Sequence, residues 1–504
     1  MGVKHLIFIK VVCYNVSIKI MENCTMNRVM LLYPPGKQYQ RSEDRAQCNI
    51  DDSAVATTHA CNDIGYAAAV LLQREYSVFL KDYQTELATK EQVKADILEF
   101  KPDLIFISIT NATIYDDIDF INWIKSFHDC LFVIKGAIFY NPKKNLLGTL
   151  DLSNIACMVG GEIEFIMGPL TDYLLRGIGN FDDIPGIIYH NGDEFVSTKF
   201  DCWNKNLDEL PFPARHLMNN SLYLRPDTGE PMATISVAKG CPSQCIYCLT
   251  PIISGKSVRL RSVENVFAEI EECYYKFNIK NFFFKADTFT IDNEWASELC
   301  DRIINSPLFG KIEFTANSRT KPLSFELLQK MKAAGCFMLA VGFETGSEKT
   351  MKLIKKGATL EDSVRAASLI KKAGIPLFGF FMVGFPWETK EDIKQTEKFI
   401  FKLNPDFIEI HIAMPYYGTE LYQYCVDYNT LSDLAWGNDY YAPNTIGTAS
   451  VSLDEVIKIK KQMQLRFHLR PIYILKTFKK RITSFTEFKN YAHHAIKLLK
   501  KNLF

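Results

Sequence analysis

The chain has 504 residues, of which 47% are hydrophobic, so it is long enough to form about two to four packed domains. Its 58 Lys and Arg residues balance 58 Asp and Glu residues, and this lack of excess charge argues against a DNA- or RNA-binding protein. Most of the 14 cysteines stand alone in apolar segments, which is typical of reduced core residues in a cytoplasmic protein rather than of a disulfide scaffold.

The first 25 residues are apolar, but Lys10 interrupts them and no small-residue cleavage site follows. We therefore interpret residues 1–25 as an extension outside the first domain: either the protein starts at Met21 or Met26, or the preceding residues form a loosely attached strand. The chain has no other uninterrupted apolar run of about 18 residues, so we expect no transmembrane helix.

Short apolar strands alternate with helical patterns between residues 26 and 180, which predicts a parallel sheet covered on both faces. Such a domain is Rossmann-like (flavodoxin-like), and it binds ligands at the carboxyl ends of its strands. No Gly-x-Gly-x-x-Gly sequence follows the first strand, which argues against NAD. The expected strands are, in order, NRVMLLY, SVFLKDY, DLIFISIT, LFVIKGAIF and NIACMVGG.

Residues 181–230 are predicted to form a hairpin and a linker. In GIIYHNGDEFVS, Asn191 and Gly192 suit the two central positions of a tight hairpin turn. The following LDELPFPARHL carries two prolines close together, which indicates a domain boundary.

A second alternation of strands and helices covers residues 231–425 and contains about six βα units. Thr359 with Asp362 and Thr389 with Asp392 have the spacing of capping boxes at two of the helix starts. The pattern predicts a partial (βα)6 barrel of the TIM type, with its chemistry at the carboxyl ends of the strands. The expected strands are MATISVAKG, NFFFKAD, IEFTANS, CFMLAVGFE, PLFGFFMVGF and FIEIHIAMP.

Residues 426–504 are predicted to be largely helical. From Lys458 onward the segment is basic, and Glu487 is its only acidic residue. Two interpretations stay open: a solvated basic face packed on the barrel, or peripheral contact with an anionic membrane surface or a lipid substrate.

Three cysteines, Cys241, Cys245 and Cys248, fall within VAKGCPSQCIYCLTP, directly after the first barrel strand. Such clusters hold zinc or an iron-sulfur cluster, unless the thiols are coincidental core residues. Structural zinc requires four ligands, and no fourth Cys or His lies near this loop. The spacing therefore favours an iron-sulfur cluster whose fourth iron has no protein ligand and can bind another molecule.

This CxxxCxxC pattern, with an aromatic residue before its last cysteine, resembles the radical SAM superfamily. The preceding Rossmann-like domain, LDELPFPARHL, VGFETGS, GFFMVGFPWET and MPYYGTELY resemble the branch with an N-terminal cobalamin (B12)-binding domain, over roughly residues 26–425. The resemblance implies a [4Fe-4S] cluster on Cys241, Cys245 and Cys248. It also implies that S-adenosylmethionine (SAM) binds the open iron and is reductively cleaved to a 5′-deoxyadenosyl radical.

The resemblance further implies SAM contacts at the ends of the barrel strands. Tyr247 would support the adenine, Arg319 would bind a carboxylate, and Glu344 would bond the ammonium group or the ribose hydroxyls. Each could instead be ordinary packing or an ion pair. Further candidates are Asp287, although the Gly-Gly-Glu element of many family members is absent there, and Gly384 with Pro386. Met414 and His411 on the sixth strand are also candidates, and either could instead simply fill the barrel.

Cobalamin would lie at the carboxyl edge of the first domain. No Asp-x-His-x-x-Gly motif is present, so either cobalamin binds without a histidine ligand or the fold has lost the cofactor. The candidate residues are Ser108, Thr110, Gly136, Gly161 and Glu162.

The implied reaction is methylation of an unactivated carbon through methylcobalamin. One alternative is a radical cyclisation, rearrangement or carbon-carbon bond formation on a lipid or small molecule without methyl transfer. Another is an iron-sulfur sensor or scaffold that does not turn over. The expected partners are a small-molecule or lipid substrate and an electron donor such as flavodoxin or ferredoxin, with no nucleic acid.

Overall fold

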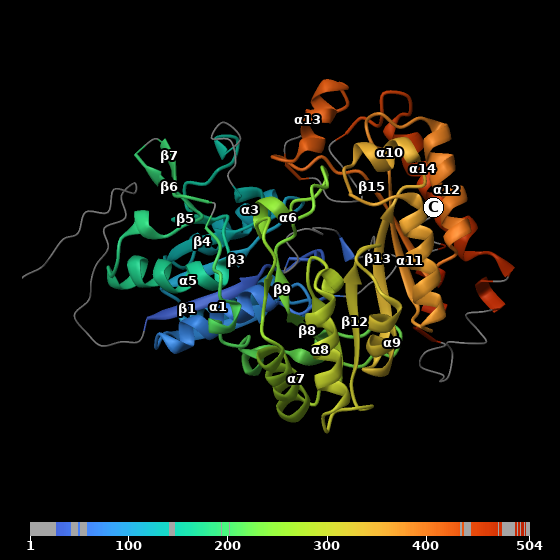
Figure 1. Ribbon diagram of the computed structural model, residues 1–504. Coiled ribbons are helices and arrows are strands. Elements are labelled where there is room, and N and C mark those ends of the chain that lie inside the picture. Colours follow the sequence, from blue (N-terminus) through green and yellow to red (C-terminus); the bar gives the residue numbers. More distant parts are fainter. Residues whose placement is uncertain are drawn as a thin grey trace, which may run out of the picture.

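The computed structural model contains two large β-sheets, each packed against helices, and they lie side by side (Figure 1). The first belongs to the N-terminal part of the chain and the second to the central part. The described residues are 27–41, 49–50, 58–140, 147–192, 194–200, 202–433, 436–437, 445–471, 473–475 and a few positions between 489 and 499. The expected extension at residues 1–25 lies outside them, as do residues 476–488 and 500–504 of the basic tail.

The first sheet has seven strands in the order β2-β1-β3-β4-β5-β6-β7, and β1 to β5 are parallel. Alternate residues of β1 enter separate hydrophobic clusters: Val29 and Leu31 pack with α1 and α5, whereas Met30 and Leu32 pack with α2 and α3. Both faces are thus buried, as predicted. The elements are β1 (Arg28–Tyr33), α1 (Asn62–Gln73), β2 (Ser77–Asp82), α2 (Lys90–Phe100), β3 (Leu104–Ser108), α3 (Ile114–Lys125), β4 (Leu131–Lys135), β5 (Cys157–Val159) and α5 (Ile163–Thr171).

The predicted hairpin forms β6 (Ile187–Asn191) and β7 (Glu194–Ser197). It extends the first sheet instead of lying in a separate linker, because β6 pairs antiparallel with β5. The sheet therefore runs past residue 180, to Ser197. Local sequence predicts a hairpin, but its attachment to β5 depends on tertiary pairing.

The second sheet has six parallel strands in the order β15-β14-β13-β12-β11-β8, so each strand pairs with its neighbour in the sequence. Within the described residues β8 and β15 do not pair, and the sheet is a partial barrel. The elements are β8 (Met232–Ser236), β11 (Asn281–Lys285), β12 (Glu313–Ser318), β13 (Cys336–Glu344), β14 (Leu377–Val383) and β15 (Phe407–Ile412), with the short pair β9 (Ala238–Lys239) and β10 (Arg259–Leu260).

Helices cover the outside of this sheet and bury one hydrophobic core against it. The two predicted capping boxes are confirmed at the starts of α11 and α12. The helices are α6 (Thr250–Ile253), α7 (Val263–Phe277), α8 (Asn293–Ile304), α9 (Phe325–Ala333), α10 (Glu348–Leu353), α11 (Leu360–Lys372), α12 (Lys390–Leu403), α13 (Glu420–Asp427) and α14 (Leu453–His468).

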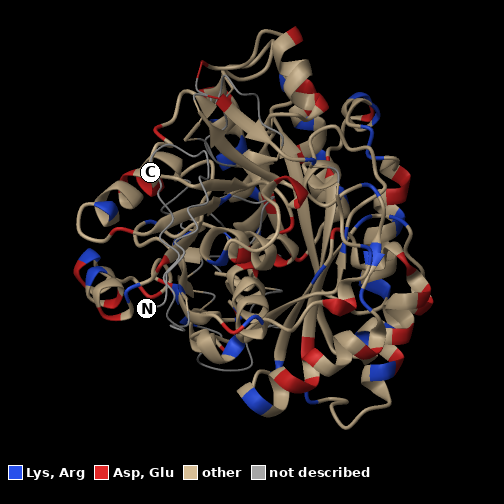
Figure 2. Cartoon of the chain, turned by 90° about the vertical axis from the view of Figure 1, so that its left-hand side faces the viewer, with Lys and Arg blue, Asp and Glu red and all other residues tan. Residues whose placement is uncertain are grey.

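Positive and negative side chains are interspersed along the outer helices (Figure 2). This distribution agrees with the balanced composition of the chain and gives that face no single sign of charge. Among the described residues, no helix combines the length and the apolar character needed to cross a bilayer.

Candidate active site

The three-cysteine loop joins β9 to α6 at the mouth of the barrel. It starts at Gly240, whose φ is +85°, and a Cβ atom there would lie 2.1 Å from the backbone oxygen of Ser257. A residue with a side chain therefore cannot replace this glycine without moving the backbone. Further along, Ile246 N donates to the carbonyl of Ile354 at 3.2 Å, and Leu421 N donates to the carbonyl of Ile246 at 3.0 Å. These bonds fix the loop to the residue that follows α10 and to the first turn of α13.

None of Cys241, Cys245 and Cys248 is in a disulfide bond, and the first two are buried. The Arg319 guanidinium donates a hydrogen bond to Cys245 Sγ at 3.4 Å. Burial lowers the pKa of Arg319, but Cys245, Cys241 and Tyr247 together raise it, so the net shift is upward. The positively charged guanidinium thus lies beside one of the three thiols. The donor set therefore fits a metal cluster with thiolate ligands.

Glu344 ends β13 and carries a buried carboxylate that pairs with Lys356. Lys356 Nζ lies 2.7 Å from Glu344 Oε1, and both side chains are less than a tenth exposed. The backbone of Glu344 has a φ of +67°, which is unusual for a residue other than glycine and occurs often at functional sites. A Cβ at Gly342 would lie 2.4 Å from Glu344 Oε1, so that glycine leaves room for the carboxylate.

Arg319 and Glu344 share Lys356 as a partner. Arg319 Nη2 donates to the backbone carbonyl of Lys356, whose ammonium holds Glu344. Burial raises the pKa of Tyr247, and the nearby Glu344 carboxylate raises it further, so Tyr247 keeps its proton. The structure therefore brings three of the predicted SAM contacts together beside the cysteines.

Other predicted contacts are also at strand ends. Asp287 follows β11 and accepts a hydrogen bond from Thr250 Oγ1 at 2.9 Å, which places it next to Cys248. Gly384 follows β14 with a φ of +85°. Met414 follows β15 and is buried, and the ring of His411, within β15, lies 6.0 Å from that of Phe380.

A polar cavity of about 80 Å³ lies where the first domain meets the barrel mouth. Gly161 and Glu162 contribute to it from the first domain, and Asp287 contributes from the barrel. Asn62, also in its lining, is buried and donates to Thr234 O at 2.7 Å, while its Oδ1 has no hydrogen-bond partner among the described residues. An unpaired buried acceptor facing a cavity suits a ligand that carries amide or hydroxyl donors.

Three of the cobalamin candidates do not line this cavity. Ser108 Oγ donates to Asp63 Oδ2 at 2.9 Å, and Thr110 Oγ1 lies 2.9 Å from Thr113 Oγ1. A Cβ at Gly136 would lie 3.1 Å from the side chain of Ile109. These contacts are within the first domain, so the structure gives these residues an internal packing role.

Glu162 connects the two domains. Its carboxylate accepts hydrogen bonds from Arg259 at 2.7 and 2.9 Å, and it lies 3.5 Å from Lys239 Nζ. Burial raises the pKa of Glu162, but Lys239 and Arg259 together lower it below its ordinary value, so the group is ionised. Lys239 also pairs with Glu164. The carboxylate that we assigned to cobalamin is thus used in an ion pair between the domains.

We predict that Glu162→Gln lowers the free energy of unfolding by about 3–5 kcal/mol, because it leaves Arg259 buried beside a neutral group. Urea denaturation measures this change. Glu272→Gln, which breaks a surface pair with Lys276, is the matched control and should cost less than about 1 kcal/mol. Equal stability of the two variants would show that the bond between the domains contributes little.

Sequence reasoning missed several residues of this region. Lys356 belongs to no motif in the sequence. It lies 12 residues after Glu344, and only the folded structure shows that the two side chains form a pair. Lys135 and Lys239 line the cavity, yet in the sequence they are ordinary basic residues at strand ends. A basic residue at the end of a buried strand was the signal that could have singled them out.

The carboxyl edge of the Rossmann-like domain faces the mouth of a six-stranded partial barrel, where three cysteines and a buried ionic cluster lie. These features define a two-domain α/β protein whose candidate site lies where the domains meet. Residues 235–400 match the Radical SAM superfamily. This part of the chain, which begins in β8 and ends in α12, is a radical SAM domain.

Similar proteins extend the match on both sides. An uncharacterised methyltransferase of Pyrococcus horikoshii is 29% identical over 424 residues, which is 84% of this chain and 90% of that protein. The cobalamin-dependent SAM radical enzyme OxsB, solved with aqua-cobalamin, has a TM-score of 0.70 at 16% identity, over 95% of this chain and 72% of OxsB. The radical SAM methyltransferase TsrM of Kitasatospora setae, solved with cobalamin and a [4Fe-4S] cluster, has a TM-score of 0.61 at 18% identity, over 79% and 74%. The likeness to these solved structures confirms the fold class.

Proposed function

We propose that this protein is a cobalamin-dependent radical SAM enzyme that methylates an unactivated carbon. One observation carries the proposal: the thiol of Cys245, the guanidinium of Arg319 and the buried Glu344–Lys356 pair lie together at the mouth of the radical SAM domain, which faces the first domain. The names of the relatives support methyl transfer, since the P. horikoshii protein and TsrM are both described as methyltransferases.

In this proposal Cys241, Cys245 and Cys248 hold a [4Fe-4S] cluster. When bound, the cluster and SAM supply the radical and cobalamin supplies the methyl group to be transferred. Arg319 balances the charge of the thiolates and Glu344 orients the charged or hydroxyl groups of SAM, while Lys356 holds the Glu344 carboxylate in place. Tyr247 forms part of the wall of the site.

Cobalamin is proposed to bind between the two domains. The cavity there has a polar lining and the unpaired acceptor Asn62 Oδ1, both of which suit a ligand with many amide groups. Its present volume of about 80 Å³ is too small for a corrin ring. The Glu162–Arg259 ion pair joins the two domains beside this cavity.

The proposed partners are a small-molecule or lipid substrate and a one-electron donor of the flavodoxin or ferredoxin type. We also propose that the basic residues after Lys458 make peripheral contact with an anionic membrane surface when the substrate is a lipid.

Anaerobic purification followed by metal analysis and a visible spectrum tests both cofactors at once. We expect about four iron atoms and about one cobalt atom per chain. Dithionite-reduced protein incubated with methyl-labelled SAM should produce deoxyadenosine and retain label on the bound corrinoid. Iron without cobalt, and deoxyadenosine without retained label, would instead support a radical enzyme that transfers no methyl group.

A further inference from the structure

The segment between α13 and α14 leaves the barrel and returns to it. Leu431 and Thr445 form an antiparallel bridge, and Ile446 N donates to the carbonyl of Thr430 at 3.0 Å. The two ends of this segment therefore lie side by side on the barrel. The segment follows residues 235–400, which match the radical SAM superfamily, so it is an addition to the matched domain.

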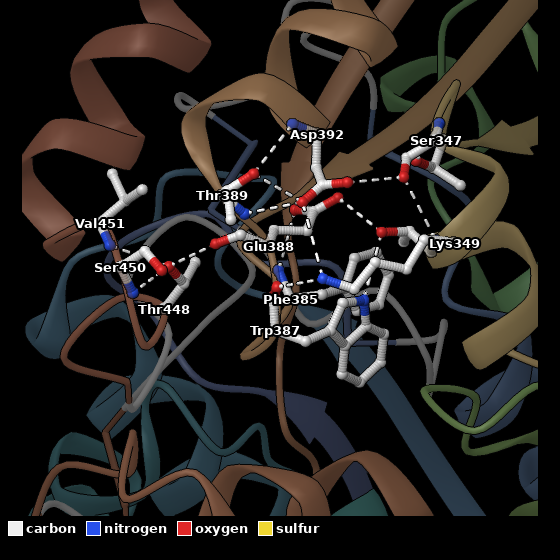
Figure 3. Close-up of polar contacts among 12 residues, drawn as sticks. Ser347, Lys349, Phe385, Trp387, Glu388, Thr389, Asp392, Thr448, Ser450 and Val451 are labelled. Carbon is white, nitrogen blue, oxygen red and sulfur yellow. Dashed lines mark hydrogen bonds and ion pairs between the residues drawn. The ribbon is translucent and has the colours of Figure 1, made fainter.

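The returning end of the segment is fixed to the loop that follows β14. Thr448 Oγ1 donates to the backbone carbonyl of Glu388 at 2.8 Å (Figure 3). The same hydroxyl oxygen accepts hydrogen bonds from Ser450 N at 3.1 Å and Val451 N at 2.9 Å (Figure 3). These bonds hold the segment in a defined position on the barrel, directly before α14.

Between these ends, Trp436 and Gly437 lie against the first domain. Trp436 is only 6% exposed and belongs to the hydrophobic cluster that packs under α2 and α3. Its Nε1 donates to Thr149 Oγ1 at 2.8 Å, and Gly437 N donates to the carbonyl of Asn111 at 3.0 Å. A tryptophan from the C-terminal part of the chain is thus built into the core of the N-terminal domain.

This anchor lies at the edge of the first sheet where Rossmann-like domains bind their ligands. Asn111 is in the loop between β3 and α3, directly after Thr110. Gly437 has a φ of +85°, which favours glycine, and a Cβ atom there would lie 3.6 Å from the ring of Tyr115 on α3. The segment therefore connects the barrel to the carboxyl edge of the first domain.

The contacts between the domains described above lie on the opposite face of the first sheet, which α1 and α5 cover. Asn62, at the start of α1, donates to the carbonyl of Thr234 on β8, and Glu162, directly before α5, pairs with Arg259. Trp436 adds a contact on the face covered by α2 and α3. A domain held on one face alone can hinge, whereas contacts on both faces fix its orientation.

We propose that Trp436 is a positioning residue that fixes the orientation of the first domain on the barrel mouth, so that the two cofactors meet. It touches neither cofactor. The proposal rests on the proposed function, in which cobalamin binds at the edge of the first domain and SAM binds in the barrel. Cleavage of SAM to deoxyadenosine depends on the barrel, whereas movement of a methyl group from SAM to the corrinoid depends on the distance between the domains. A displacement of about 1 Å can slow such a reaction about 100-fold.

Small-angle X-ray scattering of the full-length protein tests the geometry without any activity. Trp436→Ala removes the indole from the first domain, so its radius of gyration should be larger than that of the unaltered protein and its distance distribution broader. Trp123→Ala is the matched control, because Trp123 on α3 packs against the same hydrophobic cluster and stacks on Phe120. It should lower the thermal midpoint without changing the scattering.

The anaerobically reconstituted protein with methyl-labelled SAM tests the consequence. Trp436→Ala should form deoxyadenosine within about twofold of the unaltered protein and lose at least about tenfold in label retained on the corrinoid. Trp123→Ala should keep the ratio of label to deoxyadenosine. Thr149→Val leaves the tryptophan in place but removes its hydrogen-bond acceptor, so it should lower the ratio in the same direction by a smaller factor. This milder variant keeps the test valid if Trp436→Ala does not fold.

Equal losses of deoxyadenosine and label in Trp436→Ala, or scattering and a ratio unchanged from the unaltered protein, would overturn the proposal. For a poorly folded Trp436→Ala, an unchanged ratio in Thr149→Val would do so. Absence of deoxyadenosine or of label on the corrinoid with the unaltered protein would instead contradict the proposed function.

Discussion

Cys248→Ala is expected to abolish formation of 5′-deoxyadenosine by the dithionite-reduced protein. The change removes one of three thiol ligands, and the remaining two cannot hold a cubane cluster with one open iron. The loss should exceed the roughly 10- to 100-fold that follows from loss of a residue behind a metal ligand. The measurements are iron content, the visible spectrum after anaerobic reconstitution and the yield of deoxyadenosine from added SAM.

Cys300→Ala is the matched control for this experiment. Cys300 is also a buried free thiol, but it lies on α8 in the hydrophobic core behind the sheet. This variant should keep its iron and its activity and lose only some stability from the small cavity. If Cys248→Ala and Cys300→Ala retained equal iron, the assignment of the cluster to the cysteine loop would be wrong.

Lys356→Met is expected to lower SAM affinity by about 10- to 100-fold and the free energy of unfolding by about 3–5 kcal/mol. The substitution leaves the buried Glu344 carboxylate without its cation, at a position where the backbone has an unusual positive φ. Without its cation the carboxylate is no longer held in one orientation, so it no longer presents a fixed charge to SAM. Equilibrium binding and urea denaturation measure the two effects.

The adjacent Lys355→Met is the control, because Lys355 forms an exposed pair with Glu420 instead. Surface pairs of this kind contribute less than about 1 kcal/mol, so this variant should bind SAM normally. Similar behaviour of the two methionine variants would mean that the Glu344–Lys356 pair has no part in the site.

Much of the fold follows from local sequence. Alternation of short apolar strands with helices predicts both sheets, and the capping boxes at Thr359 and Thr389 mark two helix starts that the structure confirms. The hairpin at Asn191 was equally clear as a local feature. The pairing of this hairpin with β5 could not be predicted, because a hairpin can pair with any exposed strand edge.

The candidate site was predictable where chemistry depends on spacing, and not where it depends on contacts across the fold. The three cysteines of the loop lie within eight residues, so their spacing alone indicates a metal site. Glu162 shows the limit, since its position at the end of β5 suggested a ligand contact, whereas the structure pairs it with Arg259, almost 100 residues away.

Electron paramagnetic resonance of the reduced, reconstituted protein, recorded with and without SAM, tests the central claim most directly. Three cysteine ligands leave one iron open, so we predict the signal of a reduced [4Fe-4S] cluster that changes shape when SAM is added, in samples that also form deoxyadenosine. A protein that contains zinc in place of iron, or a cluster signal that SAM leaves unchanged, would contradict the account.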